Sequence, residues 1–244
     1  MNYPVIGFIC FILLLSFVLY KTNTEEPYDT KQALQRILPD RVKPLFKHTH
    51  YINLEHRVDR KRITERELHK LGIDTFERFN ALTGENGHIG CSRSHLAILK
   101  QAKQMELPYV TIVEDDIYFK RPQQTIDKLD SIQKSNHPWD VIILGGVGGE
   151  RTPLDSSCSQ AKGVSSTTGY IVHGSYLDTL IDHWEQGLKK LEADPDKHPM
   201  YALDQTWKQL QDKDQFLIVS GSDVVQRSDF SDIQGGFIDW TNYF

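Results

Sequence analysis

The sequence of 244 residues has few cysteines, no basic surplus and no glycine-rich phosphate loop. Outside the apolar N-terminal run only Cys91 and Cys158 remain, which excludes a disulfide framework; the two form either one bridge or a pair of buried thiols. The formal net charge of −5 argues against a nucleic-acid-binding protein. The missing P-loop argues against that class of nucleotide enzyme, and no cysteines and histidines have the ligand spacing of a zinc site.

A long hydrophobic run is present at the N-terminus. Residues 4–20 carry no charge, and a helix of this length, at about 1.5 Å per residue, is near the lower limit for spanning a bilayer. The run lacks the preceding basic residues and following small-residue site of a cleaved signal peptide, and the polar face of a buried helix. We therefore expect an uncleaved signal anchor at residues 1–20, a polar, proline-punctuated stem at 21–47 and a folded domain at 48–244.

Beyond the stem, short apolar segments alternate with helical patterns. Strands are expected at residues 50–54, 75–80, 109–113, 139–144, 169–172 and 216–219. Helices are expected at residues 59–71, 91–103, 175–191 and 203–210, with Ser92 or Ser94 capping the second of them. This alternation predicts an α/β domain with a mostly parallel sheet flanked by helices.

The acidic triplet Glu114-Asp115-Asp116 directly follows the buried-type strand at residues 109–113. Ligands of α/β sheets bind outside the carboxyl ends of the strands. Extended backbone places Glu114 and Asp116 on one face and Asp115 on the other, and two carboxylates on one face suit Mg²⁺ or Mn²⁺. A solvated acidic turn is the alternative interpretation.

Basic residues stand at the start of the first helix of the domain. Arg57 and Arg60 follow Asn53, and arginines at a helix N-terminus indicate either a bound anion such as a diphosphate or a plain charged helix face. Ser94 and His95 are expected in the first turn of the next helix, where His95 either contacts a ligand or has a structural role.

Taken in order, these segments resemble the family 25 glycosyltransferases, which include bacterial lipooligosaccharide galactosyltransferases and animal collagen galactosyltransferases. The shared series comprises Asn53-Leu54, Arg57-x-Asp59-Arg60, residues 81–84, Gly90-Cys91-x-x-Ser94-His95, Glu114-Asp115-Asp116 with Phe119, Trp139-Asp140, Gly169-Tyr170, Asp204, Gln226 and residues 231–233. The resemblance covers about residues 50–234, and the length of the ordered series makes coincidence a poor explanation.

The resemblance implies a GT-A-like fold, a UDP-sugar donor with galactose favoured, Mn²⁺ or Mg²⁺, and an inverting transfer to a glycan, a lipid-linked sugar or a protein. It implies that Glu114 and Asp116 hold the metal. The residues expected near the nucleotide-sugar are Asn53, Arg57, Arg60, Ser94, His95, Gly169, Tyr170 and Gln226. With its anchor the chain would be a type II single-pass membrane protein, facing the ER or Golgi lumen in a eukaryote.

An inverting transfer also needs a carboxylate base that takes the proton of the acceptor hydroxyl. Asp204 is the favoured base because it is the acidic residue of the late family motif, and Asp115 and Asp232 are alternatives. Asp204 would otherwise cap its helix or bind the donor sugar. The alternative function is a non-catalytic member that binds a nucleotide-sugar or glycan as the partner of an active enzyme.

Overall fold

The structure is a computed structural model that describes residues 37–241 and residue 243. The expected anchor and most of the expected stem lie outside these residues. Among the helices of the described part, none combines the length and the apolar character needed to cross a bilayer. The last residues of the expected stem belong to the folded domain, because Leu38, Val42, Leu45 and Phe46 are buried in its core.

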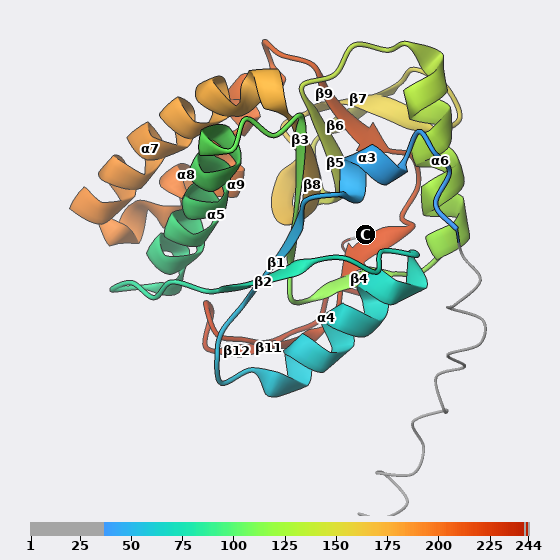
Figure 1. The fold of residues 1–244 in the computed structure, drawn as a ribbon. Coiled ribbons are helices and arrows are strands. Elements are labelled where there is room, and N and C mark those ends of the chain that lie inside the picture. Colours follow the sequence, from blue (N-terminus) through green and yellow to red (C-terminus); the bar gives the residue numbers. More distant parts are fainter. Residues whose placement is uncertain (1–36, 242, 244) are drawn as a thin grey trace, which may run out of the picture. The chain divides into compact units, whose positions relative to one another are not determined.

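An eight-stranded sheet with the order β2-β1-β3-β8-β5-β9-β7-β6 forms the centre of the domain (Figure 1). Its strands are β1 (Thr49–Asn53), β2 (Glu77–Asn80), β3 (Tyr109–Glu114), β5 (Val141–Val147), β6 (Glu150–Pro153), β7 (Cys158–Lys162), β8 (Ser165–His173) and β9 (Phe216–Val219). Strands β8 and β7 run against the others, so the sheet is mostly parallel in direction, as predicted.

Helices cover both faces of this sheet (Figure 1). They are α3 (Lys43–Phe46), α4 (Val58–Lys70), α5 (Gly87–Gln104), α6 (Pro122–Ser135), α7 (Leu177–Ala193), α8 (His198–Tyr201), α9 (Leu203–Thr206) and α10 (Lys208–Gln211). One core cluster joins the sheet to α5, α7, α9 and α10, and the other joins it to α3, α4 and α6. Alternation along β3 explains the two clusters, since Ile112 belongs to the first and Val113 to the second.

Two small antiparallel sheets lie beside the main one. Strand β4 (Ile117–Phe119) pairs with β10 (Val224–Gln226), and β11 (Asp229–Ser231) pairs with β12 (Gly236–Ile238). We call residues 229–238 the C-terminal hairpin. None of these short strands was predicted from the sequence, and neither were β6, β7 and α6. The apolar runs of the strands are too short for a periodicity argument, whereas α6 has a helical spacing of Ile126, Leu129 and Ile132 that was not used.

The second predicted helix begins earlier than expected. Asn86 caps α5, and its Oδ1 accepts a hydrogen bond from the amide of Ile89 at 3.0 Å. The expectation that Ser92 or Ser94 caps the helix is therefore wrong. Each of these serines donates to the carbonyl oxygen four residues earlier, at 2.8 Å. Glycines at the start of α5 concealed it, since glycine is unfavourable inside a helix.

Candidate active site

A cleft of about 720 Å³ opens beside the carboxyl end of β3. The structure brings most of the predicted site residues to its wall. They are Asn53, Arg60, Ser94, His95, Glu114, Asp115, Asp116, Asp204 and Gln226. Arg57, Gly169 and Tyr170 are not part of that wall. The position agrees with the rule that ligands of α/β sheets bind at the carboxyl ends of strands.

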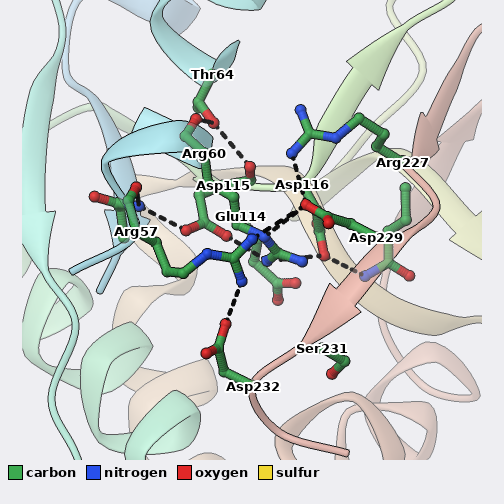
Figure 2. Close-up of polar contacts among 12 residues, drawn as sticks. Arg57, Arg60, Thr64, Glu114, Asp115, Asp116, Arg227, Asp229, Ser231 and Asp232 are labelled. Atoms are coloured by element: carbon green, nitrogen blue, oxygen red, sulfur yellow. Dashed lines mark hydrogen bonds and ion pairs between the residues drawn. The ribbon is translucent and has the colours of Figure 1, made fainter. Parts of the chain in front are cut away.

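The acidic triplet divides between two directions, as predicted, although only Glu114 lies in β3 and the two aspartates form the turn before β4. Glu114 accepts a hydrogen bond from Oγ1 of Thr167 at 2.6 Å, and Asp116 accepts a longer one from Oγ1 of Thr168 at 3.3 Å, so both carboxylates face β8. Asp115 is directed toward α4 and Arg60 instead (Figure 2). The triplet is thus a pair of carboxylates on one side and a single anchored carboxylate on the other.

Hydrogen bonds from Arg60, Asn53 and Thr64 hold Asp115 in place. Its Oδ1 accepts from Nη1 of Arg60 and its Oδ2 from Nδ2 of Asn53, both at 2.7 Å, while its carbonyl accepts from Oγ1 of Thr64 at 2.9 Å (Figure 2). Burial raises the pKa of Asp115, and the charge of Arg60 and the bond from Asn53 oppose that rise. With both oxygens occupied, Asp115 has the contacts of a residue that positions α4 against β3.

The pair Glu114 and Asp116 carries unequal charge. Burial, followed by the nearby carboxylates of Glu114 and Asp115, raises the pKa of Asp116 to about 7. Burial acts in the same direction on Glu114, but contacts with His95, Thr167 and Arg60 outweigh it and lower the pKa of Glu114. Arg60 is the nearest cation to Asp116 in the described structure, at 3.7 Å, so the carboxylates outnumber the positive charges here. Such a surplus attracts a cation.

Asp204 approaches the cleft from the start of α9. Its Oδ2 accepts hydrogen bonds from the amide of Ser166 and from Nε2 of Gln205, both at 3.1 Å, while its Oδ1 has no hydrogen-bond partner among the described residues. Ser166 holds a left-handed backbone conformation with φ of 77°, which is uncommon for a residue other than glycine. Burial raises the pKa of Asp204. A carboxylate with one open oxygen and a raised pKa has the properties of a general base.

Arg57 contacts the C-terminal hairpin. Its guanidinium pairs with Asp232 at 2.5 Å (Figure 2) and with Asp229 at 3.2 Å. It also pairs with Asp59 at 2.9 Å and donates to the carbonyl of Phe230. Arg60 adds bonds to Asp229 and to the same carbonyl. The two arginines therefore fasten the hairpin to the start of α4, a role that the sequence analysis did not assign to them.

The other end of the hairpin touches α5. An added Cβ on Gly87 would lie 2.8 Å from Cα of Ile233, so the start of α5 and the hairpin are in close contact. Ile233 and Trp240 both line the cleft. The hairpin therefore runs from α4 to α5 along the rim of the cleft.

We expect Arg57→Gln to loosen the hairpin without unfolding the domain, because it removes the ion pairs to Asp229 and Asp232. Amide hydrogen exchange in residues 229–238 should accelerate at least about tenfold, and exchange in the β3 amides should stay unchanged. Asp59→Asn is the matched control, since it removes the one partner of Arg57 that lies outside the hairpin. Equal exchange in Arg57→Gln and the parent protein would contradict this role.

The remaining predicted residues have structural contacts. The hydroxyl of Ser94 accepts from the amide of Leu82 at 2.8 Å in addition to its bond within α5. Gln226 donates to Asp116 over 3.5 Å and orients it. Gly169 leaves room for Ile117, whose Cδ1 would lie 2.7 Å from an added Cβ. Tyr170 is fully buried, and its hydroxyl lies 2.7 Å from Nδ1 of His95.

The structure adds residues that the sequence analysis had not selected. Thr167 and Thr168 bond to the acidic pair, and Asp229 joins both arginines. Cys91 lines the cleft one helical turn before His95, and burial together with the surrounding carboxylates raises the pKa of its thiol well above the usual value. The signal for Cys91 was its spacing of four from His95, which places both on one face of a helix.

Comparison with known proteins finds one family and several relatives to which this chain is similar. Residues 85–147, which run from the start of α5 through the acidic triplet to the end of β5, match the family described as "Glycosyltransferase family 25 (LPS biosynthesis protein)". Procollagen galactosyltransferase 1-A of Xenopus laevis is 27% identical over 212 residues. The chain is therefore similar to glycosyltransferase family 25, most clearly in the segment that carries the acidic triplet. The alignment covers 67% of the chain but spans only about a third, 34%, of the Xenopus protein.

Two solved structures share parts of the fold. Mannose-1-phosphate geranyltransferase from Thermus thermophilus matches with a TM-score of 0.43 and 11% identity, over 72% of this chain and 73% of that one. A glycosyltransferase involved in the glycosylation of the major capsid of PBCV-1 matches with a TM-score of 0.39 and 10% identity, over 71% of this chain and 91% of that one. Scores this low support no conclusion about the chemistry of this chain.

Proposed function

We propose that this chain is a metal-dependent, inverting glycosyltransferase. It would move a hexose, with galactose favoured, from a UDP-sugar to a hydroxyl of a glycan, a lipid-linked sugar or a protein. The observation that carries the proposal is the carboxylate pair of Glu114 and Asp116, which faces the cleft at the end of β3 with a surplus of negative charge. Galactose is favoured because the Xenopus relative is named a procollagen galactosyltransferase.

The residues of the cleft fit a hard divalent cation. The carboxylate of Asp116 has only long contacts, at 3.3 Å from Thr168, 3.5 Å from Gln226 and 3.7 Å from Arg60. Carboxylate oxygens are the ligands that Mg²⁺ and Mn²⁺ prefer, and both ions are commonly held by one or two carboxylates together with substrate phosphates. Glu114 and Asp116 would hold the ion. When bound, it neutralises charge on the departing nucleoside diphosphate.

The protein groups around the pair then have separate tasks. Arg60 lies between Asp115 and Asp116, so it holds the triplet in place and adds one positive charge beside the leaving group. Asp204 would take the proton of the acceptor hydroxyl on its open Oδ1, while its bonds to Ser166 and Gln205 fix the carboxylate. We favour Asp204 over Asp115 as the base because both oxygens of Asp115 are occupied.

A comparison of UDP release with and without sugar acceptors tests the proposal. A transferase releases UDP faster when its acceptor is present and forms a new glycosidic bond, detected by mass spectrometry. A hydrolase releases UDP at the same rate in both cases, and a non-catalytic binding protein binds UDP without turnover. Either of these results, obtained with a full panel of glycan and protein acceptors, would overturn the proposal.

We also propose that residues 1–20 anchor the chain in a membrane as a type II single-pass protein, because their uncharged run is long enough for a bilayer. In a eukaryote the domain would then face the ER or Golgi lumen. After alkaline extraction of membranes from expressing cells, the full-length chain should remain in the pellet. Release of most of the chain into the supernatant would contradict the anchor.

A further inference from the structure

The wall of the cleft contains a second group of candidate metal ligands, which shares Glu114 with the pair of Glu114 and Asp116. The ligand atoms of Cys91, His95 and Glu114 all lie within 4.8 Å of one another. Cys91 and His95 are four residues apart on α5, which brings their side chains together on one face of the helix. Glu114 reaches them from the end of β3.

His95 has an unused ring nitrogen at this point. The side chain is completely buried, and Nε2 lies 3.4 Å from Oε1 of Glu114. At that separation Nε2 has no partner in hydrogen-bond geometry among the described residues. Buried polar atoms without a partner are rare and costly, so such an atom indicates a missing ligand.

The second ring nitrogen of His95 is fixed by a neighbour. Nδ1 lies 2.7 Å from the hydroxyl of Tyr170, which is itself fully buried and packs edge-on against Trp184 and Trp207. With the proton on Nδ1 and donated to Tyr170, Nε2 carries a lone pair and lies 3.4 Å from Oε1 of Glu114. Metal-binding histidines have this arrangement, in which the other ring nitrogen donates to an oxygen that orients the ring.

We propose that Cys91, His95 and Glu114 form a binding site for a thiolate-preferring divalent cation such as Zn²⁺ or Co²⁺. Metal–ligand distances of about 2.0–2.3 Å place neighbouring ligands of a tetrahedral ion about 3.3–3.8 Å apart, and the 3.4 Å between His95 and Glu114 lies in that range. The thiol of Cys91 loses its proton to solvent as the sulfur–metal bond forms. The fourth position faces the cleft and takes water.

This site shares Glu114 with the metal site of the proposed function. A soft ion at Cys91 and His95 would therefore compete with Mn²⁺ or Mg²⁺ at Glu114 and Asp116. This competition rests on the proposed function. Binding of the soft ion depends only on the three side chains, so it can be tested without any measurement of turnover.

A second group, His137, Asp155 and Cys158, provides an internal control. Its ligand atoms also lie within 4.8 Å of one another. Its histidine is already paired, however: Nε2 of His137 lies 3.0 Å from Oδ2 of Asp155, whereas Nε2 of His95 has no partner in hydrogen-bond geometry among the described residues. Oδ1 of Asp155 also accepts from the amides of Ser157 and Cys158. We therefore expect a metal to prefer the group at Cys91.

The test is a titration of the full-length reduced chain with Co²⁺, followed through the near-ultraviolet charge-transfer band of a cobalt–thiolate bond. We expect the band to saturate at one equivalent and to disappear when Zn²⁺ is added. Cys91→Ser should abolish it and Cys158→Ser should preserve it. Tyr170→Phe should raise the Kd for Co²⁺ about 10–100-fold, as expected for loss of an orienting partner.

Three results would overturn the site: no band in the parent chain, a band that survives in Cys91→Ser, or a band lost in Cys158→Ser alone. Circular dichroism of each variant separates loss of metal binding from loss of folding. Should Cys91→Ser unfold, Cys91→Ala replaces it, since alanine is well tolerated inside a helix. UDP release is not measured in this experiment, so its failure would leave the proposed transferase activity untouched.

Discussion

Asp116→Asn is expected to reduce UDP-sugar turnover about 1,000-fold. The amide keeps the shape of the side chain but removes the charge that a divalent cation needs, and a bound cation stabilises charge on the leaving diphosphate by several kcal/mol. About 4 kcal/mol corresponds to a factor of about 1,000 in rate. Stability should not fall, because burial and two neighbouring carboxylates oppose the charged form of Asp116, and its pKa of about 7 reflects this.

The measurement is the rate of UDP release at saturating Mn²⁺, together with the Mn²⁺ concentration that gives half of the maximal rate. Asp182→Asn is the matched control, since Asp182 is an exposed aspartate on α7 and the substitution removes the same charge. A turnover within about threefold of the parent chain in Asp116→Asn would show that this carboxylate does not hold the metal.

Asp204→Asn is expected to reduce transfer to an acceptor by about 100- to 10,000-fold, the usual range for loss of a general base. The affinity for UDP should remain within a few-fold, because the hydrogen bonds of Asp204 go to Ser166 and Gln205 rather than into the cleft. The substitution should also change the pH dependence. In the parent chain turnover falls as the pH drops through the raised pKa of Asp204, because the protonated carboxyl group accepts no proton.

Asparagine does not titrate, so the residual activity of Asp204→Asn should lose this acidic limb. Asp204 does not cap α9, because it lies inside the helix and Ala202 is the N-cap. The two readouts still separate a base from a structural residue, since a residue that only holds Ser166 and Gln205 would alter stability and leave the pH profile in place. Near-normal turnover in a folded Asp204→Asn protein would make the assignment of the base wrong. Asp232→Asn and Asp115→Asn then test the other two carboxylates that the sequence offers.

The main features of the domain were predictable from the sequence where apolar periodicity is strong. Strand β9 covers the predicted residues 216–219. Strand β1 and helix α4 each begin and end one residue before their predicted ranges, and β3 ends one residue after its predicted range. The predicted helix at residues 203–210 is instead two short helices, α9 and α10, which meet at the buried Trp207. Period alone does not reveal such a break.

The site divides in the same way between predictable and unpredictable parts. The sequence predicted the opposite directions of Asp115 and Asp116, but from an extended backbone that the structure does not have here. Both residues form the turn between β3 and β4. The pairing of Arg57 with Asp232 joins residues 175 positions apart and depends on where the C-terminal hairpin folds. Both hairpin strands have three residues, too few for a pattern of alternation.

The central claim is metal-dependent transfer from a nucleotide-sugar, and the most direct test is UDP release by the purified full-length chain. A panel of UDP-sugars is assayed with Mn²⁺, with Mg²⁺ and with EDTA, in the presence of glycan and protein acceptors. We predict release that is fastest with UDP-galactose, stops with EDTA and returns when Mn²⁺ is restored. Release that continues unchanged in EDTA, or a folded chain that releases UDP from none of the donors, would contradict the claim.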